Sequence, residues 1–241
     1  MGRGVGRAMA GLKLGVLISG RGSNLQALID ACTQADYPAE IVLVVSNKPD
    51  AQGLKRAQAA GIATLTISHR DFDERDGFDA AIGAALEGAG AELVCLAGFM
   101  RVLGEPFVER WRDRLINIHP SLLPAFKGLN TQARAVDAGV RISGCTVHFV
   151  RPAMDDGPII VQAAVPVLAG DDEASLAARI LVAEHKAYPL AVRLIADGRA
   201  RVVNERVVID GAADIEGLML NPPDPAGRRH GIFELFERKG S

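Results

Sequence analysis

The 241-residue sequence has little cysteine, little net charge and no long apolar run. Its three cysteines, Cys32, Cys95 and Cys145, are scattered and form no CxxC pair, which excludes a disulfide framework or zinc spacing and is typical of a reducing compartment. A formal net charge of −2 gives no electrostatic reason to expect nucleic acid or a membrane as a partner. Apolar runs such as 41–45 are far too short to span a bilayer. We therefore expect a cytoplasmic protein, and a phosphorylated small molecule remains a possible ligand because it needs only a local site.

The length suits one large domain with short extensions. Residues 1–11 contain Arg3 and Arg7 but no apolar segment, so we expect a disordered tail rather than a signal peptide. Residues 12–210 are predicted to form a single domain. Residues 211–241, which include three prolines, are predicted to be a C-terminal extension or tail.

Apolar runs that suit strands alternate with helical patterns along most of the chain. The expected strands are 12–19, 41–45, 63–67, 93–97, 115–119, 144–150 and 159–165, and the expected helices are 25–32, 51–60, 78–86, 106–112, 131–138 and 171–195. This alternation predicts an α/β fold, a mostly parallel twisted sheet of Rossmann-like type with helices on both faces. Strands 144–150 and 159–165 should pair antiparallel, and 201–210 should form a small hairpin with Asn204 and Glu205 at its turn.

The most informative stretch is 115–124, LINIHPSLLP. On a strand, Asn117 and His119 point to one face while Ile116 and Ile118 point to the other, into a core. Prolines then end the strand. An amide donor beside a titratable ring suits stabilisation of an oxyanion and movement of a proton. The alternative is a strand end whose polar side chains only tie down a turn.

Two loops follow predicted strands near this stretch. Gly20–Asn24 lies between a strand and a helix, where free backbone N–H groups favour a phosphate. It is neither G-x-G-x-x-G nor a Walker A sequence, and a βα turn without a ligand is the alternative. Gly98–Leu103 is apolar, which suits a flat aromatic ligand, although core packing is the commoner use. Both loops and His119 follow carboxyl ends of strands, where α/β sheets bind ligands, so we expect one site.

A buried imidazole that must be charged near neutral pH needs an anionic partner. Asp155 and Asp156 both lie in the loop before Gly157-Pro158, and the physics of the sequence does not rank them. A Ser-His-Asp hydrolase using Ser19, Ser23 or Ser121 is disfavoured because the sequence has no G-x-S-x-G. Glu184 falls in the middle of the long predicted helix, where a solvated face is the alternative to a binding role.

Five separated motifs then carry a family resemblance. Residues 117–124, together with Asp155 in MDDGP, resemble the folate-dependent formyltransferases. Residues 18–25 (ISGRGSNL), 96–101 (LAGFMR) and 183–189 (AEHKAYP) narrow the resemblance to the phosphoribosylglycinamide formyltransferases. The similarity runs from about residue 12 to residue 210 with the motifs in the family's order, which makes it specific.

The resemblance implies transfer of a formyl group from 10-formyltetrahydrofolate to the amino group of glycinamide ribonucleotide, without metal or ATP. It implies small-molecule partners, no nucleic acid or membrane, and a monomer or homodimer. It also implies roles for particular positions. Those that match the family are Asn117, His119 and Asp155 as catalytic, Gly22, Ser23, Asn24 and Glu184 toward the ribonucleotide, and Arg75, Met100, Arg101, Val102 and Leu103 toward the folate. The family pattern favours Asp155 over Asp156.

The sequence also departs from the family. Asn130 and Gln132 stand where the family usually has histidines, and Asp156 stands where glycine is common. Two related activities stay open. A formyltetrahydrofolate deformylase normally has an extra N-terminal domain, and a transfer-RNA formyltransferase needs a basic C-terminal domain. We expect neither domain in this chain.

Overall fold

The computed structural model describes residues 11–211, so the predicted tails lie outside the described residues except at their inner ends. The elements are β1 (Leu12–Ile18), α1 (Ser23–Cys32), β2 (Ala39–Ser46), α2 (Gln52–Ala59), β3 (Thr64–Thr66), the 3₁₀ turn η1 (His69–Asp71), α3 (Arg75–Gly88), β4 (Leu93–Leu96), α4 (Glu105–Arg110), β5 (Leu115–His119), α5 (Thr131–Asp137), β6 (Ile142–Phe149), β7 (Ile159–Pro166), α6 (Glu173–Ala196), β8 (Ala200–Val203) and β9 (Arg206–Ile209).

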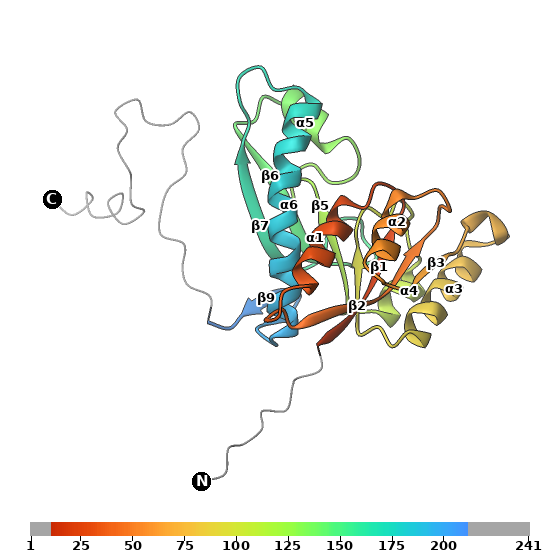
Figure 1. Cartoon of the computed structure of the whole chain (residues 1–241). Coiled ribbons are helices and arrows are strands. Elements are labelled where there is room, and N and C mark those ends of the chain that lie inside the picture. The colour runs from red at the N-terminus through yellow and green to blue at the C-terminus, as the bar shows by residue number, and fades with distance from the viewer. Residues whose placement is uncertain (1–10, 212–241) are drawn as a thin grey trace, which may run out of the picture.

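One seven-stranded sheet organises the chain, in the order β3-β2-β1-β4-β5-β6-β7. The pairs from β3 to β5 are parallel, whereas β6 runs antiparallel to both β5 and β7. The predicted mostly parallel sheet with an antiparallel strand pair is confirmed (Figure 1). The strand order reverses between β1 and β4, and a crevice for ligands is expected at such a reversal. The loops after β1 and β4 flank this point.

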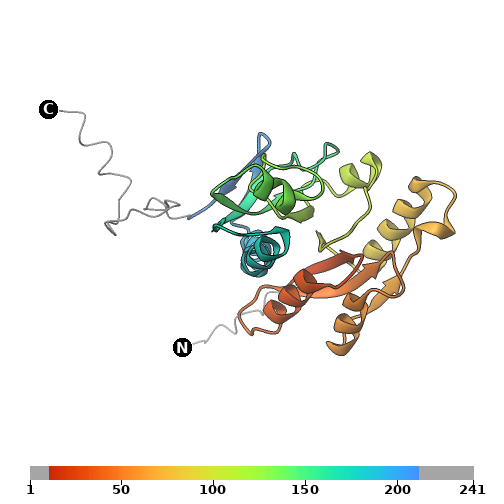
Figure 2. The ribbon, with the colours of Figure 1, turned by 90° about the horizontal axis from the view of Figure 1, so that it is seen from above.

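Alternating side chains build a core on each face of the sheet. On β1, Val16 and Ile18 join a cluster with α1, α2 and α6, while Leu17 joins a second cluster with α3 and α4. Figure 2 shows α1 and α6 lying side by side. On β5, Ile116 and Ile118 belong to the first cluster. Asn117 therefore points to the opposite face of the sheet, as the sequence predicts. On that face its amide lies beside His148 of β6.

The long helix α6 is fixed at its start and at its middle. Asp172 and Ser175 form a capping box, in which each side chain bonds the other's backbone N–H. The buried hydroxyl of Tyr188 donates to the carbonyl oxygens of Leu96 and Ile116, 3.0 and 3.3 Å away. These bonds tie α6 to the carbonyls of β4 and β5, so the helix has a fixed position on the sheet.

Two local expectations can be compared with the structure. Helix α3 begins at Arg75 rather than Phe78, because Asp76 in its first turn suits a helix N-terminus. The predicted hairpin at the end of the domain is confirmed as β8–β9. Asn204 and Glu205 form its turn with φ of 50° and 57°, the left-handed pair that a two-residue hairpin turn requires.

Candidate active site

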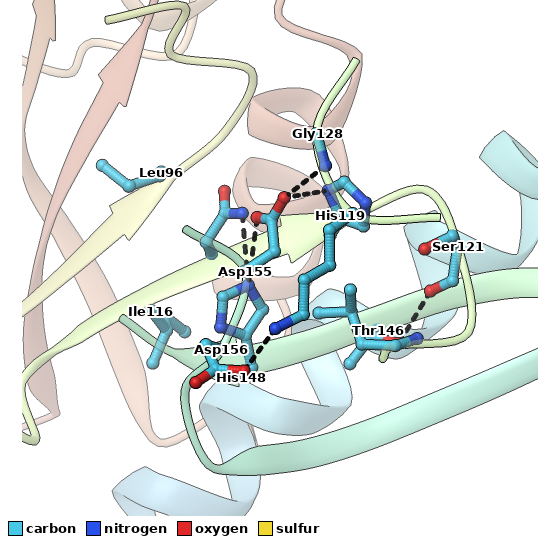
Figure 3. A network of polar contacts seen from close by, with 12 residues as sticks. Leu96, Ile116, His119, Ser121, Gly128, Thr146, His148, Asp155 and Asp156 are labelled. Atoms are coloured by element: carbon cyan, nitrogen blue, oxygen red, sulfur yellow. Dashed lines mark hydrogen bonds and ion pairs between the residues drawn. The ribbon is translucent and has the colours of Figure 1, made fainter. Parts of the chain in front are cut away.

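The site is built around His119 at the end of β5 (Figure 3). The His119 side chain is 7% exposed, and its ring lies between two acceptors. The Nε2 atom is 3.0 Å from the carbonyl oxygen of Phe126, and Nδ1 is 3.5 Å from Oδ2 of Asp155. A neutral ring offers one N–H, whereas an imidazolium offers one to each acceptor. Acceptors from two different loops therefore hold the ring at both of its nitrogens.

Asp155 rather than Asp156 is the acid beside this ring. Its Oδ2 also accepts a 2.8 Å hydrogen bond from the backbone N–H of Gly128, and its φ is 50°. Asp156 points away and pairs with Lys127 at the surface. The two neighbouring carboxylates thus tie the 150–158 loop to the loop after β5 at two points. Gly157 packs so tightly that a Cβ would lie 1.6 Å from the Phe149 carbonyl oxygen.

His148 on β6 belongs to the same cluster, and the sequence did not predict it. It is the register partner of Asn117 across the antiparallel β5–β6 pair. Its Nδ1 is 2.9 Å from the Phe149 carbonyl oxygen, so that nitrogen carries the proton. Burial lowers the pKa of His148, although the Phe149 carbonyl and Asp155 oppose the shift. The neutral ring then offers the lone pair of Nε2 to the Asn117 amide, 3.4 Å away.

The glycine loop after β1 has a structural reason for its glycine. Gly22 has φ of 70°, and a Cβ there would lie 2.6 Å from the Cα of Gly53 at the start of α2. Helix α1 begins at Ser23, and the N–H groups of its first turn have no acceptor within the helix. Close packing against α2 thus explains why residue 22 is a glycine. The same loop also presents backbone N–H donors at the N-terminus of α1.

The structure brings Asn24 and Glu184 together. The Asn24 amide donates to Oε2 of Glu184 over 2.7 Å, and Glu184 is 7% exposed, so the alternative of a solvated face does not hold for this residue. Burial raises the pKa of Glu184, and the Asn24 bond partly offsets this. Within the described residues, Oδ1 of Asn24 is buried without a hydrogen-bond partner. An unpaired buried acceptor of this kind suits a ligand that donates a hydrogen bond.

The loop after β4 divides into an exposed and a buried part. Met100 and Val102 are 64% and 62% exposed, and Arg101 between them is also exposed. Leu103 instead packs in the core under α3 and α4. The loop is tied to the sheet by the N–H of Met100, which donates to the buried Ser19 hydroxyl over 2.8 Å.

Asp79 on α3 anchors the other end of this loop, and the sequence did not predict that role either. Its carboxylate is 4% exposed and accepts the backbone N–H of Gly104 over 2.6 Å. Burial raises the pKa of Asp79, while the Gly104 bond and the nearby Arg75 lower it. Arg75 lies next to the end of the loop that carries Met100 to Leu103, because a Cβ on Gly104 would be 3.5 Å from its Nε.

Two further findings concern the family departures and the capacity for metals. Asn130, with φ of 54°, is exposed immediately before α5, where asparagine tolerates the left-handed region. Gln132 accepts a hydrogen bond from Thr131. Among residues 11–211, no group of three His, Cys, Asp or Glu side chains could hold a metal ion. In the same part of the chain, no helix has the length and apolarity to cross a membrane.

A Rossmann-like sheet with an amide, two imidazoles and a carboxylate gathered at β5 and β6 defines an α/β enzyme. The model of the formyl transferase family matches residues 12–192, three quarters of the sequence. The chain belongs to the formyl transferase family.

Several proteins of known name are similar. The trifunctional purine biosynthetic protein adenosine-3 of Drosophila melanogaster is 57% identical over 182 residues, 75% of this chain and 14% of that protein. This chain therefore spans only a small part of such trifunctional relatives. The phosphoribosylglycinamide formyltransferase of Escherichia coli K12 is 48% identical over 177 residues, 73% of this chain and 84% of that enzyme.

Solved structures agree with these relatives. Glycinamide ribonucleotide transformylase 1 from Symbiobacterium toebii has a TM-score of 0.83 and 47% identity, covering 86% of this chain and 98% of that one. A formyltetrahydrofolate deformylase from Burkholderia mallei has a TM-score of 0.77 at 30% identity and covers 83% of this chain and 70% of its own. The deformylase is thus the more distant of these two structural neighbours.

Proposed function

We propose that this protein transfers the formyl group of 10-formyltetrahydrofolate to the amino group of glycinamide ribonucleotide, a step of purine biosynthesis. The observation that carries the proposal is the cluster of Asn117 and His119 on β5, His148 on β6 and Asp155 on the loop after β6. The family of the chain and the names of its relatives support the same substrates.

In this reaction the substrate amine attacks the formyl carbon, and negative charge develops on the formyl oxygen. The Asn117 amide has a second hydrogen for that oxygen, because His148 accepts only one. The His119 imidazolium is the other donor, once the formyl oxygen replaces the Phe126 carbonyl as the acceptor of Nε2–H. Each such donor is typically worth about 3–4 kcal/mol. Asp155 stabilises the charge on His119 and orients the ring through Nδ1. His148 stays neutral and holds the Asn117 amide group in place by accepting one of its hydrogens.

The acceptor substrate needs an anchor, because positioning lowers the barrier of a two-substrate reaction substantially. The loop of Gly22, Ser23 and Asn24 offers backbone N–H groups at a helix N-terminus for the ribonucleotide phosphate. Glu184, paired with Asn24, is a partner for a hydroxyl or amine of the same ligand. The unpaired Oδ1 of Asn24 adds an acceptor to this subsite.

The residues around the loop after β4 fit a folate. Met100 and Val102 are largely exposed apolar side chains, and so are Leu129 and Met154 on the two loops that flank His119. An apolar rim suits the flat rings of the donor. Arg75 at the start of α3 offers a cation for the glutamate carboxylates of a folate. When bound, the folate supplies the formyl group, and these residues hold and orient it.

Hydrolysis of the same donor, the deformylase reaction, is the competing activity because it begins with the same donor and the same cluster. The two differ in the nucleophile. We expect donor consumption to be fast only when glycinamide ribonucleotide is present, with formylated product formed in equal amount. The assay follows donor loss by absorbance with and without acceptor and measures formate separately. Rapid formate release that is unchanged by acceptor would refute transfer and support hydrolysis.

A further inference from the structure

The loop that carries Asp155 starts at a buried arginine that the proposed chemistry does not use. Arg151 lies two residues beyond Phe149, the last residue of β6, and is only 9% exposed. Its guanidinium makes three hydrogen bonds: Nε donates to Glu205, Nη2 donates to Asp113, both over 2.7 Å, and Nη1 donates to the Val150 carbonyl over 3.1 Å. A planar guanidinium whose three nitrogens all donate hydrogen bonds has little freedom to move.

The two carboxylate partners of Arg151 come from separate parts of the chain. Asp113 lies in the turn that leads into β5, and Glu205 lies at the tip of the β8–β9 hairpin. Glu205 also accepts a 2.6 Å bond from Arg112, so the hairpin tip is held by two arginines. The Arg151 bond lowers the pKa of Glu205, so its carboxylate stays charged through the neutral range. Through Glu205, the hairpin is thus bonded to Arg112 shortly before β5, which ends in His119. It is also bonded to Arg151 at the start of the 150–158 loop, which carries Asp155.

The two ends of the 150–158 loop are also fixed by the backbone. The N–H of Val150 donates to the Leu115 carbonyl over 2.8 Å, and the N–H of Phe149 donates to the Pro158 carbonyl over 2.9 Å. Between these ends, Asp155 adopts the left-handed φ of 50° and lies 3.5 Å from Nδ1 of His119. Asp155 is close to Arg151 along the chain, so a shift at Arg151 reaches Asp155 directly.

We propose that Arg151, clamped between Glu205 and Asp113, is a positioning residue that sets the distance between Asp155 and His119. The inference rests on the proposed function, because that function makes the distance matter for the rate. It also explains the place of the C-terminal hairpin, because the hairpin supplies Glu205 to the clamp. The competing explanation is that these ion pairs only hold the hairpin on the domain.

Kinetics and hydrogen exchange together test the proposal. Arg151→Met should lower kcat about tenfold, since misplacing a catalytic group costs rate steeply, with KM of both substrates within about twofold. Arg151→Lys should recover only part of kcat, because an ammonium lacks the fork that joins two carboxylates. Glu205→Gln should lower kcat in the same direction. The control is Asp210→Asn, which removes the 3.5 Å ion pair with Arg201 in the same hairpin and should leave kcat unchanged.

Backbone amide exchange of residues 153–156, measured by mass spectrometry, should be faster in Arg151→Met and Glu205→Gln, with exchange in β5 unchanged. Lower thermal stability in these variants with wild-type kcat and wild-type loop exchange would overturn the proposal. Should Arg151→Met fail to fold, Glu205→Gln carries the test, because it keeps the size of the side chain. A wild-type protein without acceptor-dependent turnover would refute the proposed function instead, and the exchange experiment would still decide the clamp.

Discussion

Replacing Asp155 by asparagine removes the negative charge beside His119 while keeping the size of the side chain. The amide oxygen can still accept the Gly128 N–H, so the two loops should stay together. Unit charges 3.5 Å apart, in an effective dielectric of about 20, attract by about 5 kcal/mol. This energy is the upper limit of the stabilisation that the His119 imidazolium loses in the variant. The actual loss is smaller, because the Asp155 side chain is 11% exposed and solvent screens part of the attraction.

We therefore expect Asp155→Asn to lower kcat about 10²–10³-fold, the effect of weakening one oxyanion donor. The matched control is Asp156→Asn, which removes the neighbouring charge. Its pair with Lys127 is exposed, and exposed pairs contribute about 0–1 kcal/mol, so kcat should stay within about threefold of wild type. Steady-state kinetics with saturating substrates measures both variants, and thermal unfolding checks that both are folded. A large loss in Asp156→Asn with wild-type turnover in Asp155→Asn would refute this assignment of the acid.

Three further changes test the rest of the site. His148→Phe should lower kcat about fivefold, since a neutral hydrogen bond to Asn117 is worth about 1 kcal/mol. The pKa of His148 in the folded protein lies below its ordinary value of about 6.5, so the unfolded chain binds a proton more readily. The stability of the wild type should therefore fall as pH drops below about 6.5, and urea unfolding should show a smaller fall in His148→Phe. Glu184→Gln should gain stability relative to wild type as pH rises above about 4.5, the ordinary pKa of a glutamate, because the raised pKa of Glu184 makes the folded wild-type chain hold a proton that the unfolded chain releases. An equal pH dependence of the two proteins would contradict this. Asp79→Ala should leave the Gly104 N–H without its acceptor, cost about 1–3 kcal/mol of unfolding free energy and raise KM for the folate several-fold, whereas an unchanged folate KM would exclude a role for this anchor.

The sequence predicted those parts of the fold and site that depend on neighbouring residues. Alternating strands and helices are local patterns, and they predicted the α/β sheet correctly. The shared face of Asn117 and His119 follows from their two-residue spacing and is also local. The glycine loop was found by its place between a strand and a helix.

The remaining features depend on contacts between distant segments. His148 faces Asn117 only because β6 pairs antiparallel to β5 in a particular register, 31 residues away. Local physics did not rank Asp155 and Asp156, and only the family resemblance favoured Asp155. The structure adds the positive φ of Asp155 and its contact with His119, whereas Asp156 pairs with Lys127. Arg151 meets a carboxylate 54 residues further along the chain, and no local pattern indicates such a partner.

The most direct test of the central claim follows the formyl carbon itself. A donor labelled with ¹³C in its formyl group is incubated with the protein and glycinamide ribonucleotide, and NMR measures how the label divides between the formamide product and formate. The proposed function predicts that nearly all label enters the formamide, and that His119→Ala slows this transfer at least about 10²-fold while folate still binds. Label that accumulates in formate at the same rate with and without acceptor, or a His119→Ala variant with wild-type turnover, would contradict it.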